Sequence, residues 1–302
     1  MSDRLISLDT ALREARSVLA LQREIGGPTR FLAGSPDLEL ATHAATPETE
    51  NLAPEPPHSA PRQLDAPATP QPDDGLPTDD SDVPDLFGAL PDPSQDPTLS
   101  PYERIGSLIP EGHPLHDLNS LEAIHDWLAD TVLVPIDEDR INPVLGTGDP
   151  NADLMVIGEA PGADEDRQGE PFVGRSGQLL DKILAAVLFE REEVYICNIL
   201  KSRPPNNRDP LPAEVEAHIP ILYKQIALVR PKVLLAVGKS AGNGLLKKKA
   251  SLASLRGTFQ DFYGLPLLVT YHPAALLRNP QWKRPTWEDV KLLRTRYDQL
   301  TG

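Results

Sequence analysis

Short continuous apolar runs alternate with longer stretches of helical periodicity from residue 119 to the end of the chain. The apolar runs cover 153–158, 193–199, 233–238 and 267–271. Such runs are typical of parallel strands that are buried on both faces, and the stretches between them would supply the covering helices. The pattern predicts an α/β domain over 119–302, with three α/β/α layers around a central four-stranded, mostly parallel sheet.

The stretches between the runs carry apolar residues at the spacing of helices. These predicted helices cover 177–188, 214–229, 240–246 and 286–300. Upstream of the domain, residues 3–25 also show helical periodicity, within an N-terminal segment of residues 1–33. This amphipathic helix either packs on the domain's own surface or docks on a partner protein, and both interpretations stay open.

The segment 34–118 is acidic and rich in proline. It holds 2 basic and 17 acidic side chains, a net charge of -15, and 17 of the chain's 33 prolines. Such a composition buries too little apolar surface to offset the entropy of ordering, so we predict a disordered linker. Its apolar island at 83–90 is a candidate short motif for a replication or repair protein, as is the helix over 3–25.

Charge is uneven within the domain as well. Residues 119–200 hold 5 basic and 17 acidic groups, whereas residues 201–302 hold 17 basic and 7 acidic groups. A basic half in a chain of net charge -16 predicts a surface that neutralises phosphate, so nucleic acid is the expected partner.

Cys197 is the chain's single cysteine, which excludes an internal disulfide and any multi-cysteine metal site. No apolar run approaches the length of a membrane span, and the N-terminus lacks the pattern of a signal peptide. We therefore expect a monomer without membrane contact. Its expected place is the cytoplasm, at the nucleoid, in a bacterium or archaeon, and the nucleus or an organelle in a eukaryote.

Polar and aromatic side chains follow the predicted strands, at the edge where open parallel sheets bind ligands. They are Glu159, Glu165, Phe172, Asn198 and His272. The glycines of this region match neither the dinucleotide fingerprint nor a P-loop, which disfavours nucleotide hydrolysis. An aromatic face, an amide and an imidazole suit a planar heterocycle on which negative charge develops.

Five sequence blocks follow one another in a specific order. They are Gly-Glu-Ala-Pro-Gly at 158–162, Pro-Phe-Val-Gly at 171–174, Gly-Gln-Leu-Leu at 177–180, Asn-x-x-Lys-x-Arg-Pro-Pro at 198–205 and His-Pro-x-x-Leu-Leu-Arg at 272–278. In this combination the chain resembles the family 4, iron-sulfur type, uracil-DNA glycosylases. The resemblance implies an enzyme that flips deoxyuridine out of single- or double-stranded DNA and hydrolyses its N-glycosidic bond in base excision repair.

The resemblance also implies residue roles. His272 would stabilise the uracil anion, and either Glu159 or Glu165 would position the attacking water. Phe172 would stack on the flipped base, Asn198 would bind its edge, and Ala160 and Asn207 would line the substrate site. Residues expected to contact DNA are Lys201, Arg203, Arg208, Arg256, Leu276 and Arg278, with Leu276 entering the duplex. These residues could also have ordinary structural roles. Phe172 would then be a core residue, Asn198 a cap at the end of a strand, and His272 a loop histidine without a catalytic role.

The chain departs from the family at the iron-sulfur cluster. The four cysteines that bind the cluster in the family correspond here to Thr131, Val134, Ser202 and His218. One imidazole cannot hold a cluster without sulfur ligands. We therefore predict a variant without cofactor or metal, in which packing and polar contacts around these positions replace the cluster.

Two alternative functions stay open at this point. The chain could be a binding module for uracil-containing or single-stranded DNA that has lost turnover, or a glycosylase for another base such as hypoxanthine. Covalent trapping on DNA is disfavoured, because the loop over 201–210 has neither a histidine nor an insertion.

Overall fold

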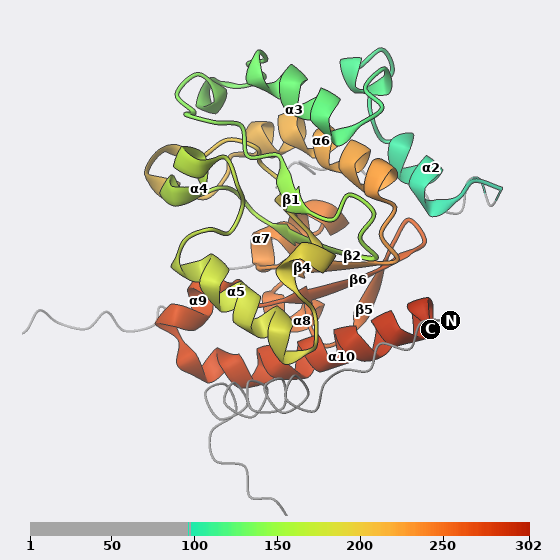
Figure 1. The fold of residues 1–302 in the computed structure, drawn as a ribbon, viewed down its shortest axis with the longest axis vertical. Helices are drawn as coiled ribbons and strands as arrows, with labels where there is room; N and C mark the ends of the chain where they lie inside the picture. Colours follow the sequence, from blue (N-terminus) through green and yellow to red (C-terminus); the bar gives the residue numbers. More distant parts are fainter. Residues whose placement is uncertain (1–95, 97) are drawn as a thin grey trace, which may run out of the picture. The chain divides into compact units, whose positions relative to one another are not determined.

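The computed structural model describes residues 96 and 98–302 (Figure 1). The helix expected over 3–25, the motif at 83–90 and most of the expected linker lie outside the described residues.

A parallel sheet forms the middle of the domain. Its strands are β2 (Leu154–Gly158), β3 (Tyr195–Asn198), β4 (Val233–Val237) and β6 (Leu265–Thr270), which pair in the order β3-β2-β4-β6. These are the four strands predicted from the apolar runs, and the α/β class is confirmed.

Two edge strands were not predicted, so the sheet has six strands rather than four. β1 (Gly146–Gly148) pairs antiparallel with β3, and β5 (Phe259–Phe262) pairs antiparallel with β6. β1 is three residues long with two glycines, and β5 has two polar residues between two phenylalanines. Neither edge strand therefore has the sequence pattern of a strand buried on both faces.

Successive strand residues point to opposite faces of the sheet and build two cores. Met155 and Ile157 of β2 belong to the first core, whereas Leu154 and Val156 belong to the second. The first core is shared with α2 (Pro101–Gly106), α3 (Leu121–Ala129), α6 (Pro212–Val229), α7 (Lys239–Leu246) and α8 (Leu252–Leu255). The second is shared with α5 (Arg175–Ala186), α9 (Pro273–Arg278) and α10 (Lys283–Thr301). Figure 1 shows α3 and α6 above the sheet and α5 and α10 below it, so the three predicted layers are present.

Short elements complete the described chain. They are α4 (Ala163–Gln168) and the 3-10 turns η1 (Pro114–His116), η2 (Pro135–Asp137), η3 (Arg191–Glu193), η4 (Pro205–Asn207) and η5 (Pro280–Trp282). Within the described part of the chain, no helix combines the length and the apolar character that crossing a membrane requires.

The ordered domain begins before residue 119, so the predicted end of the linker at 118 was wrong. Ile105, Ile109 and Leu115 are buried in the first core. The Tyr102 hydroxyl donates hydrogen bonds to the carbonyl oxygens of Arg230 and Pro231, both at 3.1 Å. Because the composition of residues 34–118 was taken as a whole, and is acidic and rich in proline, it did not reveal these few apolar side chains, which pack beside α6.

Candidate active site

The end of β3 is joined to the loop that follows β2. The N–H groups of Ile199 and Leu200 donate to the carbonyl oxygens of Gly158 and Glu159, each at 3.0 Å. Because the two strands are parallel neighbours, these bonds extend their pairing beyond the strand ends. They bring Glu159 and Asn198 to the same edge of the sheet.

The side-chain amide of Asn198 lies against Gly158 and Phe172. Only 2% of the residue is exposed, and within the described structure its Oδ1 has no hydrogen-bond partner. A Cβ atom on Gly158 would lie 2.2 Å from this Oδ1 and 2.7 Å from Cζ of Phe172. Glycine is therefore required where the amide and the ring converge on the strand end. Since a buried acceptor without a partner is costly, the amide is set up for a donor that a ligand brings.

Phe172 has a left-handed backbone, with φ of 55°, which is strained for a bulky residue. Gly177 in the first turn of α5 permits this conformation, because a Cβ there would lie 1.7 Å from the Phe172 carbonyl oxygen. Arg191 donates to the carbonyl of Pro171 at 2.7 Å and fixes the preceding residue. The Phe172 ring stacks on His272, with centroids 5.5 Å apart and planes 30° apart.

His272 is the N-cap of α9, and its ring has one defined acceptor and one free donor. The Ala274 N–H donates to Nδ1 at 3.1 Å, so the proton of the neutral ring is on Nε2. Burial and, to a lesser extent, the nearby Arg278 charge lower the pKa of His272 to about 4, while Glu165 opposes the shift. The imidazole is therefore neutral at physiological pH and offers an N–H donor.

Glu165 joins two loops of the site. Its Oε1 accepts from the N–H groups of Val173 and Gly174 at 3.0 and 3.2 Å, and its Oε2 accepts from the Gly162 N–H at 3.1 Å. The buried carboxylate thus holds the loop after β2 against the loop that carries Phe172. Both oxygens accept backbone hydrogen bonds, so Glu165 joins the two loops in this structure, and its expected role in positioning water stays a prediction.

Glu159 has different surroundings from Glu165. It lines a cavity of about 240 Å³ together with Asp209, Ser240 and Asn243, and its neighbour Ala160 is partly buried against the first core. Burial raises the pKa of the Glu159 carboxyl, and a hydrogen bond with Ser240 opposes that shift. Of the two predicted carboxylates, Glu159 is the one that reaches a space large enough for water.

Three of the predicted basic residues lie at or near the surface of the loops. Arg203 donates through Nε to Oδ1 of Asn207 at 2.7 Å, in the exposed turn η4. Arg208 pairs with Glu214 at 2.5 Å, and its side chain stays partly exposed. Arg278 is exposed at the end of α9. Their positions are compatible with the phosphate contacts expected from the sequence.

Lys201 and Arg256 do not fit the predicted role as DNA contacts. Lys201 is fully buried, with 0% exposure, so its ammonium group cannot reach phosphate. Arg256 forms an ion pair with the buried Asp289 at 2.9 Å, donates to the Pro285 carbonyl, and lies over the Tyr271 ring. The guanidinium of Arg256 is therefore committed to holding α10 against the sheet.

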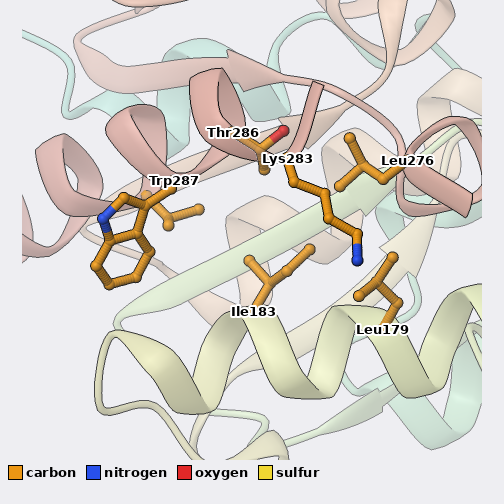
Figure 2. Close-up of a pocket in the computed structure, with 7 residues that line it drawn as sticks. Leu179, Ile183, Leu276, Lys283, Thr286 and Trp287 are labelled. Atoms are coloured by element: carbon orange, nitrogen blue, oxygen red, sulfur yellow. The ribbon is translucent and has the colours of Figure 1, made fainter. Parts of the chain in front are cut away.

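Leu276 also differs from the prediction. Only 1% of it is exposed, and Figure 2 shows its side chain in an apolar pocket between α5 and α10, facing Leu179 and Ile183 of α5. Thr286 and Trp287 of α10 lie on the other side of this pocket. Its neighbour Leu277 is 43% exposed, so in this structure Leu277 rather than Leu276 is the accessible leucine of α9.

A buried polar cluster occupies the region of the predicted iron-sulfur ligands. We define the Asp137 cluster as Asp137, Arg140, Ser202 and His218. Oδ1 of Asp137 accepts from Ser202 Oγ and from His218 Nε2, the latter at 3.1 Å, and lies 3.4 Å from Arg140 NH1. Burial alone would raise the pKa of Asp137, but the hydrogen bonds from His218 and Ser202 hold this pKa well below its usual range.

The residues at these positions do not fit an iron-sulfur cluster, which needs several sulfur ligands. Ser202 and His218 are bonded to the same carboxylate, and the Thr131 hydroxyl donates to the Trp127 carbonyl at 2.6 Å. Cys197 is buried in β3, outside this set. Across residues 98–302, no group of three or more His, Cys, Asp and Glu side chains is arranged to hold a metal ion.

Several residues that shape the site were not predicted. Asp137 and Arg140 have no recognisable motif, because their contacts join segments far apart in the sequence. Gln225, which accepts a hydrogen bond from Lys201, lies within α6, and Ser240 lies in the first turn of α7, where polar residues are ordinary. Only the predicted need for polar contacts around Ser202 and His218 pointed toward the Asp137 cluster.

Comparison with known proteins identifies uracil-DNA glycosylases as relatives of this chain. The sequence profile of the uracil DNA glycosylase superfamily matches residues 145–291. The type-4 uracil-DNA glycosylase of Saccharolobus solfataricus is 43% identical over 161 residues, which are 50% of this chain and 74% of that protein.

Two further type-4 uracil-DNA glycosylases match over most of their length. The Thermotoga maritima protein is 38% identical over 175 residues, 57% of this chain and 91% of the relative. The Pyrobaculum aerophilum protein is 36% identical over 180 residues, 57% of this chain and 92% of the relative.

Proposed function

Because the chain belongs to the type-4 uracil-DNA glycosylases, we propose that the pocket formed by Asn198, Phe172 and His272 receives a uracil flipped out of DNA. The protein is a monofunctional glycosylase that hydrolyses the N-glycosidic bond of deoxyuridine, a step of base excision repair. The observation that carries the pocket assignment is the buried, unpartnered Oδ1 of Asn198. Uracil presents a ring N–H beside a carbonyl, so this oxygen would accept from the ring while the amide nitrogen donates to the carbonyl.

Bond breaking in this pocket is mainly electrostatic. As the bond between the base and the sugar lengthens, its electron pair moves into the uracil ring and onto a carbonyl oxygen. The Nε2–H of neutral His272 donates to that oxygen. The Phe172 ring, which stacks on His272 in this structure, would present its remaining face to the uracil and exclude water. A neutral donor in a dry pocket stabilises the developing anion without an imidazolium that would have to be desolvated.

Glu159 orients the water that completes the hydrolysis. The water oxygen bonds to the sugar carbon as the uracil anion departs, and the carboxylate takes up the water proton. This role is supported by the cavity beside Glu159 and by the backbone bonds that occupy Glu165. Glu165 acts indirectly, by holding the loop that carries Phe172.

The surface around the pocket binds DNA through phosphate contacts from Arg203, Arg208 and Arg278. The exposed Leu277 of α9 enters the duplex where the base has left, because its neighbour Leu276 is committed to the apolar pocket. The described domain carries every side chain of this arrangement, so one chain suffices for the proposed activity, and we propose that the enzyme acts as a monomer.

This glycosylase works without an iron-sulfur cluster. The Asp137 cluster ties η2, the loop after β3 and α6 together at the positions where relatives of this type carry cluster ligands. Iron analysis and absorbance near 400 nm of anaerobically purified protein test this. We expect substoichiometric iron and no absorbance band, and one cluster's worth of iron per chain would contradict it.

The experiment that tests the function is product analysis on a panel of DNA substrates. Duplexes and single strands carrying uracil, hypoxanthine, or thymine opposite guanine are incubated with the protein, and released bases and abasic sites are quantified. We expect uracil release with repeated turnover. Binding of uracil-DNA without base release would instead indicate a binding module, and preferential release of another base would indicate altered specificity.

A further inference from the structure

The ammonium group of Lys201 is buried behind the base pocket. Its Nζ lies 2.5 Å from the carbonyl oxygen of Asn198, 2.5 Å from Oε1 of Gln225 and 3.4 Å from the carbonyl oxygen of Leu145. These three acceptors match the three N–H donors of an ammonium group. Every one of them is neutral, and in the described chain no carboxylate forms an ion pair with Lys201.

The buried titratable groups next to Lys201 are uncharged at pH 7, so the local charge is that of the Lys201 ammonium group itself. Burial lowers the pKa of Lys201 to about 8, and Cys197 opposes this shift. Burial raises the pKa of Cys197 to about 11 and raises that of Tyr195 as well, so both β3 groups are neutral at pH 7. Glu122 of α3 acts on the Tyr195 phenol.

Gln225 of α6 completes the surroundings of the ammonium. Its Nε2 donates to the Leu145 carbonyl at 3.0 Å and to the Tyr195 hydroxyl at 2.9 Å, so its Oε1 faces Lys201. The Lys201 ammonium and the Gln225 amide together connect the end of β3, the segment before β1, and α6. A buried cation without an ion partner is unfavourable for folding. The presence of an ammonium group in this place therefore motivates a functional explanation.

The contact with Asn198 supplies that explanation. Lys201 binds the main-chain oxygen of the residue whose side-chain amide faces the pocket. We propose that Lys201 is a positioning residue of the base pocket: its ammonium group fixes the Asn198 backbone and places a positive charge behind the amide that binds the base. The inference rests on the proposed function, because the charge acts on the uracil anion that forms during excision.

The pH dependence of excision follows from this arrangement. Lys201 is mostly charged at pH 7 and loses its proton as the pH rises through about 8. Single-turnover excision by the wild-type enzyme is therefore expected to fall at least fivefold between pH 7 and pH 9. The mechanism does not use the other buried groups nearby, Cys197 and Tyr195, which stay protonated over most of this range.

Two variants and a control separate this role from a purely structural one. Lys201→Met is expected to excise uracil at least tenfold more slowly at pH 7, with a flat profile from pH 7 to pH 9. Gln225→Glu places a carboxylate next to Lys201, keeps it protonated, and is expected to reduce the alkaline decline to less than twofold. The control is Lys232→Met, which removes an exposed lysine paired with Asp153 at the start of β4 and is expected to behave as wild type.

Each result is decisive. A folded Lys201→Met enzyme with the wild-type rate and profile would overturn the proposal, as would a wild-type profile without alkaline decline. If Lys201→Met fails to fold, the pH profiles of excision by the wild type and by Gln225→Glu decide whether the proposal holds. If the wild-type enzyme releases no uracil at any pH, the proposed function itself fails, which is distinguishable from failure of the lysine role.

Discussion

Glu159 and Glu165 lie in the same region of the chain, and their carboxylates meet different surroundings. Glu165 accepts three backbone hydrogen bonds, whereas Glu159 lines a cavity beside Ser240. The sequence identifies both carboxylates, but their roles depend on which N–H groups the fold directs at them. The buried hydrogen bonds therefore distinguish two carboxylates that the sequence pattern treats as equivalent.

Glu159→Gln is expected to lower the single-turnover excision rate at least tenfold at pH 7, an effect of about 1.4 kcal/mol or more. Because burial raises the pKa of Glu159, the wild-type rate should decline at low pH, beginning above the ordinary glutamate pKa of 4.5. The variant has no carboxylate to protonate, so its rate should lack that decline. Rates from pH 4.5 to pH 7 check this, and an identical decline in the variant would exclude Glu159 as the base.

Glu165→Gln is expected to act mainly on stability. An amide nitrogen in place of one carboxylate oxygen would face backbone N–H donors, which costs about 1–3 kcal/mol for a buried group. Urea unfolding measures this loss, with Glu170→Gln as the exposed control. A variant of wild-type stability that has lost all excision would show that Glu165 takes part in the chemistry.

At the level of elements, the Asp137 cluster joins three segments that are distant in sequence. Leu133 and Val134 also donate their N–H groups to Oδ2 of Asp137, at 2.8 and 3.0 Å. The Arg140 guanidinium balances the charge and donates to the carbonyl oxygens of Leu128 and Thr131. One carboxylate thus holds η2 against the loop after β3 and α6.

Asp137→Asn is expected to destabilise the fold by about 3 kcal/mol at pH 7, because it leaves buried donors and Arg140 without their anion. The pKa of Asp137 is depressed in the folded state, so this contribution is present above the ordinary pKa of 3.8 and is lost as the pH falls below it. Urea unfolding from pH 7 to pH 3 measures the difference between the variant and the wild type. Asp139→Asn, an exposed aspartate of the same segment, is the control, and equal stability of both variants would contradict the account.

Some elements were predictable and others were not. The central strands were recognised because both of their faces are apolar, which leaves a continuous run in the sequence. β1 and β5 are edge strands, and their pairing is set by the neighbouring strand rather than by their own pattern. α2 was missed because its few core residues lie in an acidic, proline-rich segment.

At the scale of the whole molecule, the charge asymmetry pointed correctly toward DNA, while individual basic residues were misassigned. Lys201 was placed on the surface because lysine is nearly always exposed, and only the fold reveals its three buried acceptors. Arg256 and Leu276 were likewise assigned from chain position, whereas Asp289 and the pocket between α5 and α10 determine where they lie. The proximity of Asn198, Phe172 and His272 was predictable, because these residues follow parallel strands whose carboxyl ends meet.

A protein truncated to residues 96–302 is expected to keep the wild-type excision rate within about twofold. Both cores, the base pocket and the Asp137 cluster are formed by residues of this part of the chain. Single-turnover rates and thermal unfolding of the full-length and truncated proteins provide the test. A truncated protein that unfolds or loses excision would show that residues 1–95 contribute to the catalytic domain.

The central claim is that Asn198 and His272 carry out uracil excision in one buried pocket. Its most direct test is the single-turnover rate of uracil release from a duplex with one deoxyuridine, for the wild type, Asn198→Ala and His272→Ala, with folding checked by circular dichroism. The account predicts that each folded variant is at least tenfold slower than the wild type, a loss of about 1.4 kcal/mol or more of transition-state stabilisation. Rates close to wild type in both variants would contradict it.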